Sequence, residues 1–459
     1  MRALRSISIL APLLLAGAPD VASAAWSLTT FDPTVNAGWG TSVCIGAVPG
    51  TVDDMVGVGH VSYWTPGQGF RYFDSITSTS TEPAAPAVPD ETQLLQTGVT
   101  ALALDGAGEP WVAQAILDQN NFSQGELSVH HRAGGVWTSE LICTVDGTPS
   151  LEMDPRAQVL HLFCSTPTGP IYAWRDGAGW HLTAFDSVTA YGVMRLDRSR
   201  RPCLAYFMFP SGKLYFARRS GGVWQSQLVD GVNSTTACDL AFNGVGQPRI
   251  AYELPSGEVR YAEENLGAWP SSTILPAGST AGQFALAIGG GDHPYLAFHD
   301  FALDQLWVTI RTAGVWTAGI VDPQVGAGQD VSMRFDGAWE PVIAYKAAYA
   351  TGARIAVGSP IVGVGDAPLM SGLALRGPWP NPARTGNPLA FVLTSPSSDV
   401  VRLEAFDVAG RTIAPPQAFH VRPGPNRLTW SGRPRAGLVF VRVANSRGQS
   451  ATTRVVVLD

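Results

Sequence analysis

Short runs of alternating apolar and polar residues, separated by glycine-rich turns, cover most of the 459-residue chain. One phrase recurs among them: apolar-x-apolar-Asp, a glycine-rich turn, a proline, and then three or four alternating apolar residues. It is clearest at residues 102–113 (LALDGAGEPWVA) and 240–251 (LAFNGVGQPRIA). Alternation with a period of two is typical of strands that bury one face, so each copy predicts two strands joined by a tight turn.

The phrase repeats at intervals of about 46 residues, which is the period of a four-stranded propeller blade. Its copies begin at residues 102, 151, 194, 240, 286 and 333, and Asp54 opens a degenerate seventh copy. A third strand follows in each unit, and a Gly-x-Trp phrase then starts a fourth. The fourth-strand tryptophans are Trp137, Trp180, Trp224, Trp269 and Trp316. The chain is therefore predicted to be all-β, with a seven-bladed β-propeller over residues 25–360.

The last copy ends at Gly358 without a tryptophan phrase, and a matching phrase stands alone at the other end of the repeats. Residues 25–32 (AWSLTTFD) align with the fourth strands that start at Trp180 and Trp224. We therefore expect an N-terminal strand to complete the last blade and close the ring, which pairs edges that an open array would expose.

The repeated Asp and Trp residues are interpreted as parts of the blades rather than as a functional site. A carboxylate in the turn can accept backbone N–H bonds, and one large ring at a fixed point of each blade can pack between neighbouring sheets. A residue that recurs in every repeat is expected to have a structural role in each repeat.

Residues 1–24 have the pattern of a cleaved secretory signal: Arg2 and Arg5, an apolar run over residues 7–18, and a small-residue site ending at Ala24. No other segment has the roughly 18 apolar residues of a spanning helix, so no membrane span is expected in the mature chain. The net charge is −7 and the basic residues are scattered, which argues against a nucleic-acid partner.

The five cysteines are odd in number and lack metal spacing, so neither a disulfide scaffold nor a metal site is indicated, and no cofactor is expected. They are Cys44, Cys143, Cys164, Cys203 and Cys238. Export permits a bridge, but the sequence leaves the pairing open.

A glycine- and proline-rich linker is expected at residues 361–376, followed by a small immunoglobulin-like β-sandwich at residues 377–459. The phrases Pro380-Asn381-Pro382, FDVAGR at 406–411, GLVFVRV at 437–443 and the terminal RVVVLD stand in order. Together they resemble the C-terminal sorting domain of type IX secretion cargo and the related immunoglobulin-like domain of flagellar hook-capping proteins. The resemblance implies that secretion machinery is a partner, and that the protein is secreted or held at the outer-membrane surface of a bacterium.

Linear motifs of nucleophilic, zinc-dependent and nucleotide-binding enzymes are absent from the sequence. The repeats loosely resemble sialidase-like propellers, but the defining SxDxGxxW phrase is not met. Arg195 and Arg334 share one repeat position, which Glu152 occupies in another copy. An ion pair between Glu152 and Arg195 across neighbouring blades explains two of these residues without sialidase chemistry.

Binding residues are expected on the face opposite the Asp turns, at the ends of the second strands and in the longest loop, 118–124. The candidates are Tyr206, Tyr252, Glu253, His299, Asp300, Tyr345, Lys346, Asp118 and Asn120. The favoured function is binding of a glycan or protein ligand without catalysis. Two alternatives stay open: an extracellular glycoside hydrolase or lyase whose carboxylates come from several blades, and a structural envelope protein.

Overall fold

The computed structural model describes residues 26–34, 37–46, 58–65, 69–74, 79–81, 96–118, 125–186, 188–279, 284–336, 339–347, 352–358, 373–379, 383–385, 389–395, 399–421, 424–432 and 434–458. Within these ranges the regular structure is β-strand except for one 3₁₀ turn at Gly290–Asp292. No helix among them is long and apolar enough to cross a membrane. The predicted signal segment lies outside the described residues.

Seven of the sheets have four antiparallel strands each, as the repeat predicts. The first three are β2 (Trp39–Gly46), β3 (Val58–Thr65), β4 (Gly69–Asp74) and β5 (Thr79–Thr81); β6 (Gln96–Leu104), β7 (Pro110–Asp118), β8 (Gly125–Ala133) and β9 (Val136–Val145); and β10 (Ser150–Asp154), β11 (Val159–Cys164), β12 (Ile171–Asp176) and β13 (Gly179–Ala184).

The next three sheets continue in chain order. They are β14 (Ala190–Leu196), β15 (Pro202–Met208), β16 (Leu214–Ser220) and β17 (Val223–Asp230); β18 (Ala237–Phe242), β19 (Pro248–Glu253), β20 (Val259–Glu263) and β21 (Ser271–Leu275); and β22 (Phe284–Ile288), β23 (Pro294–Asp300), β24 (Gln305–Thr312) and β25 (Val315–Asp322).

The seventh sheet joins the two ends of the repeat region. It contains β26 (Gln329–Phe335), β27 (Pro341–Lys346), β28 (Ala353–Gly358) and, from the N-terminus, β1 (Trp26–Asp32). Strand β1 runs antiparallel to β28, with Trp26 opposite Gly358, so the expected pairing of the N-terminal strand is confirmed.

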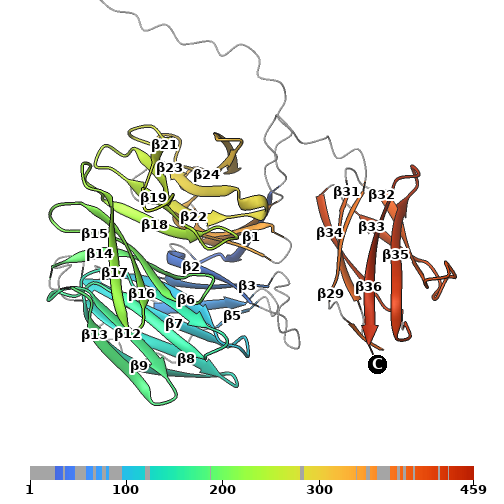
Figure 1. Cartoon of the computed structure of the whole chain (residues 1–459), viewed down its shortest axis with the longest axis horizontal. Helices are drawn as coiled ribbons and strands as arrows, with labels where there is room; N and C mark the ends of the chain where they lie inside the picture. The colour runs from blue at the N-terminus through green and yellow to red at the C-terminus, as the bar shows by residue number, and fades with distance from the viewer. Residues whose placement is uncertain are drawn as a thin grey trace, which may run out of the picture.

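The first strands of consecutive sheets contact one another in the unbroken series β2–β6–β10–β14–β18–β22–β26, and β26 contacts β2 again. This arrangement is that of a β-propeller, with these strands innermost (Figure 1). Apolar side chains fill the junctions between sheets. Leu127 of the β6–β9 sheet and Leu162 of the β10–β13 sheet, for example, belong to one buried cluster.

The recurring tryptophans pack on the preceding sheet, as predicted. The ring of Trp137 meets Phe70 edge to face with centroids 5.6 Å apart, and Trp316 meets Tyr261 at 5.4 Å. Both contacts cross a junction between sheets, so the tryptophans help to hold neighbouring blades together.

The recurring acidic residues form the turns between first and second strands, which confirms their structural role. Asp105 Oδ1 accepts the N–H groups of Ala107 and Glu109 at 2.8 and 2.9 Å. Asp197 Oδ1 accepts those of Ser199 and Arg201 at 2.9 and 3.0 Å. The carboxylate thereby satisfies two backbone donors that the tight turn leaves free.

The C-terminal strands form a separate pair of sheets around one core (Figure 1). The three-stranded sheet contains β29 (Ala374–Trp379), β31 (Leu389–Ser395) and β34 (Gly424–Trp430). The five-stranded sheet contains β30 (Ala383–Arg384), β36 (Ser450–Leu458), β35 (Gly437–Asn445), β32 (Asp399–Phe406) and β33 (Gln417–Val421).

The expected strands of this C-terminal unit are present, but β29, β30 and β33 were not foreseen. Strand β29 begins at Ala374, inside the segment 361–376 that was expected to be linker. The fully buried Phe391 of the smaller sheet and Val441 of the larger one belong to the same cluster. The unit is therefore a two-layered all-β module with its own hydrophobic core.

Candidate functional site

A cavity of about 290 Å³ lies between the innermost strands of the propeller. Residues of β2, β6, β14, β18, β22 and β26 line it, together with the segment from Thr148 to Leu151 at the start of β10. Most of these residues stand in the first halves of their strands, whereas the Asp turns follow the strand ends. The cavity therefore lies toward the face opposite the Asp turns.

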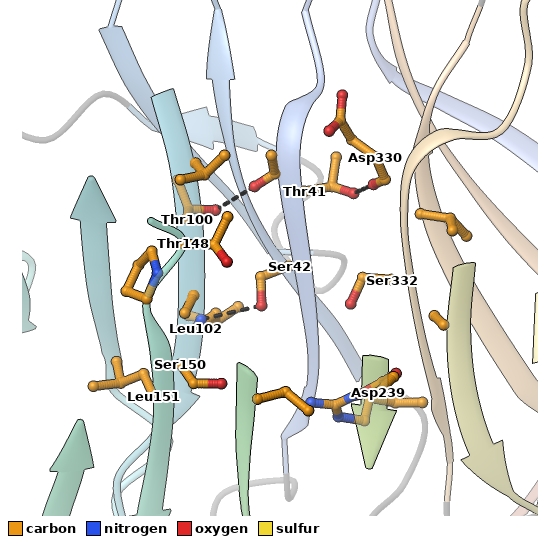
Figure 2. Close-up of a pocket in the computed structure, with 18 of the residues that line it drawn as sticks. Thr41, Ser42, Thr100, Leu102, Thr148, Ser150, Leu151, Asp239, Asp330 and Ser332 are labelled. Carbon is orange, nitrogen blue, oxygen red and sulfur yellow. Dashed lines mark hydrogen bonds between the residues drawn. The ribbon is translucent and has the colours of Figure 1, made fainter. Parts of the chain in front are cut away.

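Hydroxyl groups dominate the polar lining of this cavity. Figure 2 shows them around the open space, with Asp330 at one end and Asp239 at the other. They belong to Thr41, Ser42, Thr100, Thr148, Ser150 and Ser332. A hydroxyl can donate one hydrogen bond and accept two, so this lining suits ligands that carry hydroxyl groups themselves.

Several of these side chains also hold neighbouring blades together, because the innermost strands are sheet edges with free backbone N–H groups. Ser42 Oγ accepts the N–H of Leu102 at 3.1 Å. Likewise, Ser332 Oγ accepts the N–H of Val43 at 3.1 Å, across the junction where the ring closes. Each hydroxyl that accepts such a bond keeps its own hydrogen for donation into the cavity.

A network of four charged side chains forms the end of the site nearest the Asp turns. Arg195 Nη1 lies 3.6 Å from Glu152 Oε1, and Arg195 Nη2 lies 3.1 Å from Asp239 Oδ1. The predicted Glu152–Arg195 pair is thus confirmed. Arg334 Nη2 also reaches Glu152, at 3.9 Å. Because β10 and β26 stand on sheets as far apart as the ring allows, this last pair bridges the channel.

Burial sets the protonation preferences within this network. It raises the pKa of Glu152, and the charges of Arg195 and Arg334 oppose that effect. Burial also lowers the pKa of the Arg334 guanidinium. The two arginines and two carboxylates balance in charge, so each is stabilised chiefly by its partners rather than by water.

Asp330 stands at the other end of the cavity, and its environment is unusual for a carboxylate. Its Oδ2 atom is buried and has no hydrogen-bond partner among the described residues. Burial raises the pKa of Asp330 to about 6, against the opposing effects of Lys346 and the Gly40 N–H. An unsatisfied buried acceptor of this kind carries a free-energy cost in the folded protein.

Lys346 is buried close to this end of the cavity. Its Nζ lies 3.4 Å from the centre of the Trp39 ring and donates to Gln329 Oε1 at 3.1 Å. Burial lowers the pKa of Lys346 to about 8, although the carboxylate of Asp330 acts in the opposite direction. Lys346 is the one sequence candidate that the structure places beside the cavity, without its lining the wall.

Two of the three candidate tyrosines are buried and bonded at junctions between blades. Tyr252 donates to Asp230 Oδ2 at 2.9 Å, and Tyr345 donates to Asp322 Oδ2 at 2.7 Å. The same contact, not foreseen from sequence, joins Tyr63 to Asp32 Oδ2 at 2.8 Å. We call these three bonds the Tyr–Asp clamps.

The remaining candidates do not meet in one place. Tyr206 is buried and donates to Ser226 Oγ at 3.1 Å. Glu253 is buried, with Oε2 accepting from the Thr236 hydroxyl at 3.1 Å.

His299 and Asp300 belong to one hairpin, where His299 Nε2 lies 2.8 Å from Asp304 Oδ1 and Asp300 Oδ1 accepts the Ala302 N–H at 3.0 Å. The backbone of Asp118 ends β7, and Asn120 lies outside the described residues. Tyr206, Glu253, His299 and Asp300 do not line the cavity, and the role of all these candidates in binding stays a prediction.

Sequence reasoning missed Asp330 and the hydroxyl lining. The available signal was the residue just before two of the apolar-x-apolar-Asp phrases, where Ser150 and Ser332 interrupt an apolar pattern. Among the residues that the structure describes, no group of three or more His, Cys, Asp or Glu side chains is placed to hold a metal ion.

No protein-family model matches the sequence, and no curated protein matches it. Similar solved structures include a fungal alcohol oxidase of the AA5 family in complex with copper (10% identity, TM-score 0.46, covering 95% of this chain and 100% of that one). PorZ, a surface component of the type-IX secretion system of Porphyromonas gingivalis, is another (12%, TM-score 0.39, 87% and 64%).

A third is the six-bladed fucose-binding lectin of Aleuria aurantia (14%, TM-score 0.41, 59% and 98%). With TM-scores below 0.5, these similarities carry no argument about ligand or activity.

Proposed function

We propose that this protein is an exported propeller that binds a hydroxyl-rich ligand, such as the end of a glycan, in the cavity between its innermost strands. The observation that carries the proposal is the composition of the lining: six hydroxyl side chains along a cavity that has the Asp330 carboxylate at one end, with an Oδ2 that has no partner among the described residues. Buried polar groups are normally hydrogen-bonded, and a ligand hydroxyl would supply the missing donor once the Asp330 side chain rotates toward the cavity.

The size of the cavity limits the ligand. At about 290 Å³ it is at the lower end of the range of roughly 300–1,000 Å³ for small-molecule sites. This volume suits one saccharide unit rather than a chain. The Glu152–Arg334 bridge lies at the far end, so we expect a glycan to enter by its terminal unit from the face opposite the Asp turns.

A glycan array probed with the full-length protein tests this proposal. We expect selective binding of glycans that share a terminal unit, and a loss of at least tenfold in affinity on Asp330→Asn, which removes the acceptor charge. A matched control is Asp176→Asn, because Asp176 ends β12, accepts the Ala178 N–H at 2.8 Å and is not part of the cavity wall. If no glycan binds, or if both variants bind equally, the proposed site is wrong and a structural envelope role gains support.

A glycoside hydrolase or lyase is the second candidate, and two carboxylates in contrasting environments favour it. The pKa of Asp330, raised to about 6 by burial, allows a protonated carboxyl that could act as a general acid. Asp239, at the other end of the cavity, accepts the Leu286 N–H at 2.8 Å and pairs with Arg195. Turnover of chromogenic glycosides that Asp330→Asn abolishes would establish catalysis, and binding without turnover would exclude it for those substrates.

We further propose that the seven sheets act as a seven-bladed closed ring and that the C-terminal unit is an immunoglobulin-like sorting domain recognised by type IX secretion machinery. The resemblance of the phrases at 380–382, 406–411 and 437–443 to such sorting domains supports the second point. Deleting residues 374–459 should leave the protein in the periplasm, whereas the full chain should reach the cell surface. Equal surface exposure of both forms would reject this role.

A further inference from the structure

The fourth strands of the propeller share a position that faces the next blade. Six residues after the recurring tryptophan, four of these strands carry aspartate. These residues are Asp32, Asp186, Asp230 and Asp322. Three of them accept the bond of a Tyr–Asp clamp from the second strand of the following blade. Aspartate at this position therefore links neighbouring blades through a side-chain hydrogen bond.

In the β6–β9 sheet the corresponding residue is Cys143, six residues after Trp137. Its sulfur faces Cys164 on β11 of the next sheet, with the two Sγ atoms 3.9 Å apart. Cys164 is fully buried, and Cys143 is partly exposed. Cys164 itself takes the place of the clamp tyrosine in this blade, because Phe163 lies opposite Tyr172 just as Ala251, the neighbour of Tyr252, lies opposite Tyr261. Both members of the clamp are thus cysteine at this junction.

We propose that Cys143 and Cys164 form a disulfide that replaces the Tyr–Asp clamp between these two blades. Of the five cysteines, these are the two whose sulfur atoms lie within 4 Å of each other. A modest rotation of the side chains brings such sulfurs to bonding distance. The bond would persist in the oxidising surroundings that follow export. Its formation in the cell therefore rests on the proposed export, whereas the reaction itself does not.

The reaction is thiol–disulfide exchange with a disulfide donor, for example oxidised glutathione. The Cys143 thiolate attacks one donor sulfur, which forms a mixed disulfide and releases the other donor sulfur as a thiolate. Cys164 then loses its proton, and its thiolate attacks the Cys143 sulfur and releases the second donor thiolate. The two cysteines lose two electrons and two protons, and the donor becomes two thiols.

The surroundings of the pair fit this order of attack. The hydrogen bond from the Cys164 thiol lowers the pKa of Cys143, while the same bond and burial raise the pKa of Cys164. The partly exposed Cys143 is therefore the thiol that a donor can reach and the one that ionises first.

Peptide mapping of the purified full chain tests the proposal. The protein is incubated with oxidised glutathione, alkylated in denaturant and digested with trypsin without reduction. Cleavage after Arg132, Arg156 and Arg175 places the two cysteines on separate peptides, 133–156 and 157–175. We expect these peptides to be linked, two hydrogens lighter than their sum, while Cys44, Cys203 and Cys238 are alkylated. Alkylation of all five cysteines, or a link between another pair, would overturn the proposal.

Variants separate the disulfide from general effects of oxidation. Cys143→Ser and Cys164→Ser should each abolish the linked peptide, whereas Cys44→Ala should retain it. A reductant should lower the Tm of the oxidised wild-type protein and leave the Tm of Cys143→Ser unchanged. An equal response of both proteins to the reductant would count against a clamp. Because oxidation is performed on purified protein, a negative result here is distinct from a failure of the proposed export.

Discussion

The hydroxyl of Tyr63 donates a hydrogen bond to Asp32 Oδ2 at 2.8 Å, and this bond crosses the junction at which the propeller closes. Asp32 is the last residue of β1, the N-terminal strand, whereas Tyr63 belongs to β3 in the following sheet. Both side chains are buried. The N-terminal strand therefore completes one blade by backbone pairing and fastens it to the next by a side chain.

Replacing Tyr63 by phenylalanine should destabilise the propeller without disturbing its packing. The change removes one donor from a buried carboxylate, which costs about 1–3 kcal/mol. Urea denaturation of the wild type and the variant measures this difference. Tyr215→Phe is the control, because its ring is only half-buried and takes no part in a clamp. Equal midpoints for Tyr63→Phe and the wild type would show that the clamp contributes nothing.

Deleting residues 25–32 should destabilise the whole ring, because β28 would lose its antiparallel partner and β3 would lose Asp32. We expect a clearly lower Tm than that of a chain beginning at Ala25, as measured by differential scanning calorimetry. The chain that begins at Ala25 is the control for loss of the predicted signal segment. An unchanged Tm would mean that the ring does not depend on β1.

The Glu152–Arg334 bridge should contribute to stability by coupling opposite sides of the ring. Glu152→Gln leaves Arg195 and Arg334 with one fewer negative partner, and about 1–3 kcal/mol of stability should be lost, discounted for their partial exposure. A double-mutant cycle with Arg334→Gln isolates the pair. A coupling energy of zero would mean that the Glu152–Arg334 contact at 3.9 Å does not contribute to stability.

Asp330 should make stability depend on pH between about 4 and 6. Burial raises its pKa to about 6, so the folded protein holds this proton more tightly than the unfolded chain, whose aspartates titrate near 3.9. The folded form is then disfavoured as pH rises through this window, by a penalty on the order of 3 kcal/mol above pH 6.

Asp330→Asn cannot ionise, so its stability relative to the wild type should be greater at pH 7 than at pH 4. Denaturant midpoints of both proteins at the two pH values measure this difference, and contributions of other titrating groups cancel. If the difference between the proteins is the same at both pH values, the carboxyl has an ordinary pKa.

Much of the fold could be predicted because its determinants are local and repeated. The Asp105 turn and the Trp137 contact each depend on a phrase of a few residues, and that phrase recurs in most blades. We could predict the pairing of β1 with β28 because the last repeat lacks a fourth-strand tryptophan phrase and an unassigned one stands before the first repeat. Strands such as β30, with two residues, carry no periodic signal and could not be found.

The site was harder to predict because its residues come from different blades. Tyr252 and Tyr345 look like binding residues in a linear reading, yet each meets an aspartate of the preceding blade. The expected Glu152–Arg195 pair was the exception, since both residues occupy one repeat position in neighbouring copies. Asp330 stands outside any motif, and its significance depends on burial and on a missing partner, which no linear pattern reports.

Calorimetric titration with the best ligand from the glycan array tests the central claim most directly. Thr148 is exposed at the cavity wall, so Thr148→Trp should fill the entrance without disturbing the core, and Thr144→Trp on the outer strand β9 is the matched control. We expect the wild type and Thr144→Trp to bind alike and Thr148→Trp to lose at least tenfold in affinity. Undiminished binding by Thr148→Trp would contradict ligand binding in the cavity.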